Sequence, residues 1–292
     1  MRATLLLLPL AAALAVMPAP AAPTPPAADD DAQDLVFFSD ARPVLIRLHV
    51  RVDGKPYGAA WEAYVRIAGL DPIVLPPPSR VLTALWDARD VAVTHLVPTV
   101  IEALIGCAVS AVFAIAVAIA LDRWPPARRA VEPVLVTSQT IPIVAIAPLF
   151  VIWFGFGLLP KVLIVVLVTF FPVVVALLDG FGRVDPAAED LLQSFGATPR
   201  QAFRLLRWPS ALPSLFTGLR ISVVYAVIGA IFGEYVGATE GLGIWMKLSQ
   251  TSFRTDLVFG AILLTALVSI ALYLAVGVME RIAVPWAVAR VR

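Results

Sequence analysis

The sequence predicts an all-α protein that is integral to a membrane and crosses it with five or six helices. Composition is one reason, because 60% of the 292 residues are hydrophobic and only 15% are charged, whereas a soluble domain is nearer half apolar and a quarter charged. A second reason is a series of five apolar runs, each close to the length that a bilayer demands of a helix. The runs do not alternate in polarity, so helices rather than barrel strands are the expected spanning elements.

The five runs carry almost no charge, since only the first and the fourth contain a charged residue, Glu102 and Arg220 respectively. We expect Glu102 to lie at the outer interface and Arg220 to reach toward the cytoplasmic one. Arginines gather after the first, third and fifth runs, which all face one side if each run crosses once. That side is predicted to be the cytoplasm. The runs are Leu96–Leu121, Pro133–Gly157, Val162–Leu178, Ser210–Gly233 and Leu257–Met279.

The first 92 residues precede these runs and divide into two parts. Residues 1–22 have a charged start, a short apolar core and a small-residue cleavage site, so they form either a secretory signal peptide or a first transmembrane helix. Residues 23–92 are expected to form an extracytoplasmic segment. Within it, alternating polarity predicts a strand over Val44–Val52 with a hairpin turn at Asp53-Gly54, and an amphipathic helix follows.

Several classes of function are excluded by residues that the sequence lacks. The single cysteine, Cys107, lies in an apolar run and there are two histidines, so neither a disulfide framework nor a metal site is predicted. A net charge of +1 does not indicate the basic surface that binds nucleic acid. No Gly-x4-Gly-Lys-Ser/Thr sequence occurs, so the chain does not hydrolyse ATP through a P-loop. No catalytic residue and no cofactor are predicted, and the chain is not expected to be an enzyme.

A polar, basic segment over residues 185–213, called the elbow below, separates the third and fourth apolar runs. Asp185 is a suitable N-cap and Gly196 tolerates the left-handed conformation that ends a helix, so a short helix is predicted between them. Thr198 and Gln201 have the spacing of a capping box and predict a second helix. That helix is expected to close before Pro209. It carries Arg200, Arg204 and Arg207.

The elbow resembles the cytoplasmic EAA loop of permease subunits of ATP-binding-cassette (ABC) importers. That loop has the pattern Glu-Ala-Ala, three residues, Gly, nine residues, Ile-x-Leu-Pro. Here Asp190-Leu-Leu takes the first three places, Gly196 the glycine and Leu206–Pro209 the close, so the two alanines and the glutamate are replaced. The resemblance implies a coupling loop over residues 183–212 that contacts a separate ATPase. The implied contact residues are Asp190, Gly196, Ala197, Thr198, Arg200, Arg204 and Pro209.

The resemblance covers about residues 61–285 and places the permease transmembrane domain at 93–285. It implies a type I importer bundle similar to the methionine-importer permeases, in a bacterial inner membrane. Such subunits work in pairs, so a homodimer is expected, with two copies of an ATPase that binds the ATP and a periplasmic or lipoprotein solute-binding protein. The implied mechanism is alternating access.

The second apolar run contains a polar stretch that resembles the same family, Ser138-Gln-Thr-Ile-Pro142. Pro142 and Pro148 each remove a backbone hydrogen bond, so a kinked helix that lines the translocation path is expected. The alternative for the polar side chains is hydrogen bonding between helices. Tyr225 could equally be a packing residue, and Glu234 could cap the outer gate or lie at the interface. The predicted substrate path is Ser138, Gln139, Thr140, Pro142, Tyr225 and Glu234.

The solute is suggested by resemblance alone. Residues 139–142 and the run from Trp153 to Lys161 look most like permeases for thiamine-precursor pyrimidines and riboflavin. A small polar organic solute of that kind is therefore expected. A sulfonate, taurine or nitrate permease is the alternative. A channel or membrane scaffold without an ATPase is the alternative from another class, and the elbow argues against it.

Overall fold

The computed structural model describes residues 35–39, 42–46 and 57–288, and the chain divides into two units at Pro56. The first unit contains an antiparallel pair of strands, β1 (Leu35–Ser39) and β2 (Arg42–Ile46). Two residues separate these strands in the sequence, which is the commonest connection in hairpins.

The strand predicted over Val44–Val52 coincides with β2 at Val44–Ile46, and its remaining residues lie outside the described ones; its partner β1 precedes it in the chain. The expected turn at Asp53-Gly54 lies outside the described residues. So does the expected signal peptide or first transmembrane helix at residues 1–22.

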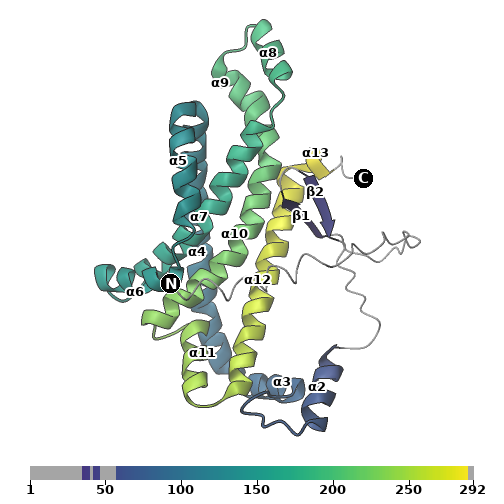
Figure 1. Cartoon of the computed structure of the whole chain (residues 1–292), viewed down its shortest axis with the longest axis vertical. Coiled ribbons are helices and arrows are strands. Elements are labelled where there is room, and N and C mark those ends of the chain that lie inside the picture. Colours follow the sequence, from purple (N-terminus) through teal and green to yellow (C-terminus); the bar gives the residue numbers. More distant parts are fainter. Residues whose placement is uncertain (1–34, 40–41, 47–56, 289–292) are drawn as a thin grey trace, which may run out of the picture. The chain divides into compact units, whose positions relative to one another are not determined.

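The second unit is helical throughout its described residues (Figure 1). Its helices are α2 (Tyr57–Ile67), α3 (Pro78–Asp87), α4 (Arg89–Arg123), α5 (Pro125–Ser138), α6 (Ile143–Phe154), α7 (Leu158–Gly182), α8 (Pro186–Ser194), α9 (Pro199–Ala202), the π-helix η1 (Phe203–Arg207), α10 (Trp208–Gly237), α11 (Leu242–Thr251), α12 (Thr255–Ala283) and α13 (Pro285–Val288).

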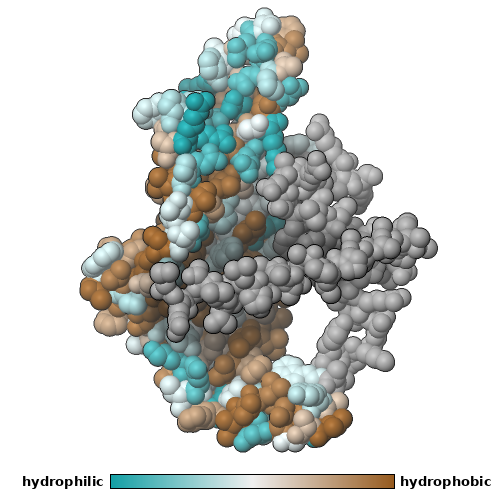
Figure 2. Space-filling model, viewed as in Figure 1, coloured by the Kyte–Doolittle hydropathy of each residue, from teal (hydrophilic) through white to brown (hydrophobic). Residues whose placement is uncertain are grey.

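Four helical segments of the described chain are long and apolar enough to cross a membrane, and the bent pair α5–α6 makes a fifth crossing if it is counted as one span. The four are α4, α7, the continuous run α9–η1–α10, and α12. Helices α8 and α9 lie at one end of this bundle and α2, α3 and α11 at the other, called the outer end here (Figure 1). In Figure 2 hydrophobic residues cover much of the visible middle, and hydrophilic ones gather toward the end with α8 and α9.

Helix α7 lies at the centre, between α4 and α10. Small residues allow the close approach, as is usual where membrane helices pack. A Cβ on Gly218 of α10 would lie 2.8 Å from the Cβ of Ala176, and the backbone of Gly106 in α4 is in direct contact with Val165. Ser222 of α10 also donates a hydrogen bond to the carbonyl of Thr169, at 2.8 Å. The three helices are therefore tightly joined.

Helix α12 packs on α10 and is fixed near its end by an ion pair. The Arg220 guanidinium lies 2.5 Å from the Glu280 carboxylate and over the ring of Tyr273. The sequence predicts that Arg220 reaches toward the interface but does not predict its partner. In the structure an ion pair between α10 and α12 holds this side chain.

The second apolar run does not form the single kinked helix that the sequence suggests. It forms α5 and α6, which meet at an angle of 96° around residues 139–142. Pro142 precedes α6 with an extended backbone, and a proline disfavours helical conformation in the residue before it. Because α4 and α7 both end near α8 and α9, the chain from Arg123 to Leu158 must return across the membrane. The pair is thus a broken span rather than a loop that re-enters on one side.

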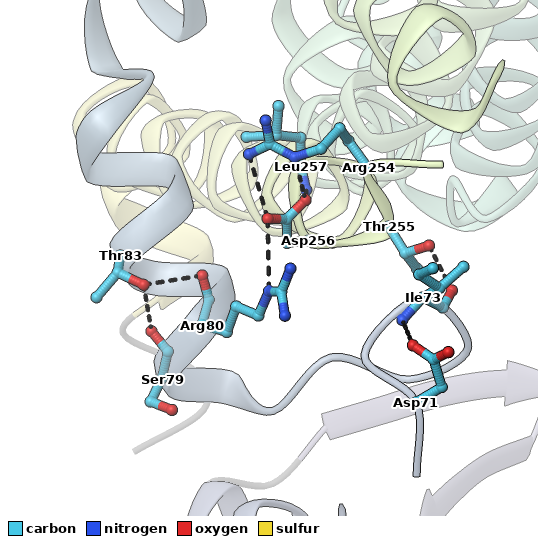
Figure 3. A network of polar contacts seen from close by, with 9 residues as sticks. All are labelled: Asp71, Ile73, Ser79, Arg80, Thr83, Arg254, Thr255, Asp256 and Leu257. Carbon is cyan, nitrogen blue, oxygen red and sulfur yellow. Dashed lines mark hydrogen bonds and ion pairs between the residues drawn. The ribbon is translucent and has the colours of Figure 1, made fainter. Parts of the chain in front are cut away.

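At the outer end, α3 and the segment between α2 and α3 are held to the start of α12 by polar contacts (Figure 3). Asp256 pairs with Arg254 at 3.0 Å and with Arg80 of α3 at 3.7 Å. The Thr255 hydroxyl donates to the carbonyl of Ile73 at 2.6 Å. These contacts fix the segment that precedes α4 against the last spanning helix.

Candidate functional site

The caps of the elbow form as the sequence predicts. The Asp185 carboxylate accepts a hydrogen bond from the Ala187 N–H at 2.9 Å and begins α8. Gly196 has φ +80°, in the left-handed region that favours glycine. Thr198 and Gln201 form the capping box: the Thr198 N–H donates to Gln201 Oε1 at 2.8 Å, and the Gln201 N–H donates to Thr198 Oγ1 at 3.4 Å.

The expectation that the second helix closes before Pro209 is wrong. Helix α9 continues through η1 directly into α10, so a single helical run of 39 residues joins the elbow to a spanning helix. Proline lacks an N–H and its ring clashes with the carbonyl four residues earlier. The π-turn absorbs this conflict, because the Trp208 N–H bonds to Phe203 five residues back and Pro209 then falls in the first turn of α10.

The predicted ATPase-contact residues lie together on the protruding part of the elbow. Asp190, Gly196, Thr198, Arg200 and Arg204 are exposed, and Ala197 and Pro209 are half-buried. Three large apolar side chains accompany them, with Leu191 58%, Phe195 81% and Leu205 68% exposed. An exposed group of this kind beside arginines is typical of a surface that binds another protein.

The contact that fixes the elbow to the bundle is one that the sequence does not predict. Arg207 lies between two carboxylates, with Nη1 at 3.0 Å from Glu189 of α8 and Nη2 at 2.5 Å from Asp122 at the end of α4. Arg123 also lies over the ring of Phe203, 5.4 Å from its centre. Because Asp122 and Arg207 are 85 residues apart in the sequence, no local pattern could have paired them.

The predicted substrate-path residues of the second run meet at the break between α5 and α6. Ser138, Gln139, Thr140 and Pro142 are all exposed. The Ser138 hydroxyl donates to the carbonyl of Leu135 at 2.7 Å, and that of Thr140 to Thr137 at 2.8 Å. Both hydroxyl groups donate to carbonyls of their own segment. They do not form the hydrogen bonds between helices that were the alternative prediction.

Tyr225 and Glu234, both on α10, have different surroundings. Tyr225 is 47% exposed, and Glu234 is fully buried. The Thr99 hydroxyl donates to Glu234 Oε1 at 2.5 Å, and the Gly243 N–H donates to Oε2 at 2.6 Å. Glu234 therefore holds the loop Gly237–Gly243, called the outer loop below, against α4.

Helix α4 makes further contacts with this outer loop. Thr99 Oγ1 accepts a hydrogen bond from the Leu242 N–H at 2.8 Å, and His95 Nδ1 accepts one from the Gly241 N–H at 3.1 Å. Gly241 has φ +128°, and any Cβ there would collide with the Glu234 carboxylate. The glycine is thus required by both its backbone conformation and its neighbour.

Glu102 is buried between helices, with only 3% of its surface exposed. Its partner is Lys161 of α7, whose Nζ lies 2.6 Å from Glu102 Oε1. Gly233 makes room for this lysine, since a Cβ at that position would lie 3.2 Å from the Lys161 Cα. Glu102 within the first apolar run and Lys161 directly before the third were both visible in the sequence, but their pairing across two helices was not.

A cavity of about 540 Å³ adjoins this region at the outer end. Its walls include the aromatic rings of Phe156 and Tyr235, the hydroxyl-bearing Thr239 and two lysines, Lys161 and Lys247. Lys247 donates to the carbonyl of Tyr235 at 3.1 Å and lies over its ring. A cavity of this size and mixed lining can hold a small aromatic or polar molecule.

Comparison with known proteins identifies relatives over most of this chain. Residues 110–287 match the family described as binding-protein-dependent transport system inner membrane component. The formylaminopyrimidine transport permease protein ThiX of Halalkalibacterium halodurans is 41% identical over 227 residues, which are 77% of this chain and 90% of that protein. The riboflavin transport system permease protein RibX of Chloroflexus aurantiacus is 34% identical over 77% of this chain and 85% of that protein. The taurine transport system permease protein TauC of Escherichia coli is 30% identical over 77% and 85% respectively.

Two solved structures are similar to this chain at low sequence identity, and the first of them shares its fold. A chain of an amino acid ABC transporter has a TM-score of 0.53 at 13% identity, covering 70% of this chain and 97% of that one. A chain of the inward-facing MetNI methionine ABC transporter has a TM-score of 0.49 at 21% identity, covering 63% and 95%. The predicted all-α importer-permease fold is confirmed. The chain belongs to the binding-protein-dependent transport system inner membrane components: it is an ABC-importer permease subunit, multi-pass in the inner membrane, which works with an ATPase and a binding protein and is not itself an enzyme.

Proposed function

We propose that this permease translocates a small polar organic solute of the thiamine-precursor pyrimidine or riboflavin type. The observation that carries the proposal is the order of identities, 41% to a formylaminopyrimidine permease and 34% to a riboflavin permease, against 30% to a taurine permease over the same share of this chain. The outer cavity supports it, because aromatic walls and cationic side chains suit a heteroaromatic ring with polar substituents. A sulfonate, taurine or nitrate solute is the alternative.

The substrate path is proposed to run past the break between α5 and α6. Broken helices within a membrane are tolerated where the freed backbone lines a water-filled path. Gln139 and Thr140 lie exposed at that break, and Ser138 and Pro142 flank them. Tyr225 and Glu234 are proposed to belong to the same path, with Glu234 acting through its hold on the outer loop in the conformation described here.

The ATPase is proposed to bind the elbow, through the exposed set Asp190, Gly196, Ala197, Thr198, Arg200, Arg204 and Pro209. Two copies of this chain and two of the ATPase would form the working importer. ATP-driven closure of the ATPase pair would then move the elbows, and with them the spans, between inward-open and outward-open states.

Uptake by cells that lack their own transporters tests the solute. The permease is expressed with its ATPase and its binding protein, and the import of labelled formylaminopyrimidine, riboflavin and taurine is measured. We expect ATP-dependent import of one of the first two. Import of taurine alone would move the assignment to the alternative, and flux without the ATPase would indicate a channel.

A further inference from the structure

We propose that Asp122 is the positioning residue through which the elbow moves α4, and that α4 carries this movement to the outer loop. The inference rests on the proposed role of the elbow as the ATPase contact. The inference concerns α4. Helices α7 and α10 are joined covalently to the elbow, whereas α4 contacts the elbow through side chains.

The elbow end of α4 is fixed by a strong pair. Asp122 is almost fully buried, with 7% of its side chain exposed, and Arg207 is 25% exposed. Charge-assisted hydrogen bonds at this distance are about twice as strong as neutral ones, and burial reduces their screening. Since the same guanidinium binds Glu189 of α8, any displacement of the elbow acts directly on the end of α4.

The body of α4 can transmit such a displacement. From Thr99 to Asp122 the helix contains no proline, and its 23-residue rise corresponds to about 35 Å; Pro98 lies between Thr99 and His95. The buried side of this stretch consists mostly of small residues that contact α7, including Gly106 against Val165. Close-packed interiors have low compressibility, so the stretch should shift as a unit.

The outer end of α4 holds the outer loop through hydrogen bonds that a small shift would break. Thr99 bonds both Glu234 and the Leu242 N–H, at 2.5 and 2.8 Å. His95 bonds the Gly241 N–H and stacks on Trp245 of α11 with ring centres 6.0 Å apart. A shift of about 1 Å takes such bonds beyond the usual 2.7–3.2 Å range. The outer loop would then be released when the elbow moves.

The test separates transmission from assembly. Asp122→Asn removes the charge, Asp122→Glu keeps it, and Asp179→Asn is the matched control, because Asp179 is exposed and forms no ion pair within residues 57–288. Each is combined with Glu240→Cys in the outer loop as a reporter, because Glu240 is exposed and does not line the outer cavity. Cys107 is the only other cysteine of the chain and is buried, so it contributes little background.

Three quantities are measured on the full complex at matched membrane levels: ATPase pull-down, uptake, and the rate at which a membrane-impermeant maleimide labels the reporter with and without vanadate-trapped ATP. We expect the labelling rate to depend on trapping in the otherwise wild-type chain, in Asp122→Glu and in Asp179→Asn. In Asp122→Asn we expect normal pull-down, loss of that dependence, and uptake lower by about tenfold, within the usual range of coupling between sites.

The proposal is overturned if Asp122→Asn keeps both uptake and the trapping-dependent labelling, or if the otherwise wild-type reporter shows no dependence. Loss of ATPase capture in Asp122→Asn alone would show that Asp122 maintains the elbow conformation that binds the ATPase. That result would also overturn the proposal. Failure of the wild-type chain to capture the ATPase would instead contradict the proposed function on which the inference rests.

Discussion

Substitution of Gly196 should weaken ATPase binding while leaving the spans intact. Its φ of +80° is strained for any residue with a Cβ, yet a Cβ placed there meets nothing within 4 Å, so the cost is backbone strain alone. That strain is about 1–2 kcal/mol. If the free elbow relaxes and must be strained again on binding, one to two kcal/mol corresponds to an affinity lower by about 5–30-fold.

The measurement is a binding curve between the purified permease and its ATPase for Gly196→Val, together with uptake at matched membrane levels. Gly182 offers a matched control, because a Cβ there also meets nothing within 4 Å, but its backbone is helical, at the end of α7. Gly182→Ala should bind like the wild type. If Gly196→Val keeps wild-type affinity and uptake, the left-handed turn does not shape the ATPase contact and the reasoning fails.

Three further outcomes are expected. Lys161→Met should lower the free energy of unfolding by about 3–5 kcal/mol, because it leaves the Glu102 carboxylate buried without its partner, and adding Glu102→Leu should recover most of that loss in thermal unfolding in detergent. Gly241→Ala should lower the melting temperature and raise protease cleavage of the outer loop, since its Cβ would collide with the Glu234 carboxylate; unchanged cleavage would show that the loop adapts. Gln139→Ala should raise the KM for uptake with normal membrane levels, and an unchanged KM would remove that residue from the substrate path.

The membrane class and the caps of the elbow could be predicted because they depend on local sequence. Apolar runs of bilayer length form helices wherever they are placed in lipid, since their backbone groups have no other partners. Asp185, Gly196 and the Thr198–Gln201 box act within a few residues of themselves, and all of them form as expected.

The errors arose where the conformation depends on a longer stretch. The sequence predicts that the helix ends before Pro209, but a π-turn over residues 203–207 lets the helix continue into α10. The run from Pro133 to Gly157 is predicted to form one kinked helix, but it forms two helices that meet at 96°. A proline disrupts the hydrogen bonding of a helix. The packing of neighbouring helices decides whether the helix kinks, forms a π-turn or ends there.

The sequence alone determined the helical membrane fold and the local turns of the elbow, because these are encoded in composition or in spacings of a few residues, and the resemblance of the elbow to the EAA loop indicated the family. Only the tertiary structure decided which charges meet: Arg207 with Asp122, Lys161 with Glu102, and Glu234 with the amides of the outer loop. A charge in an apolar segment must find a partner, since it is costly to leave it unpaired in a medium of low polarity. The identity of that partner follows from the packing of α4, α7 and α10, which brings together residues that lie tens of positions apart in the chain.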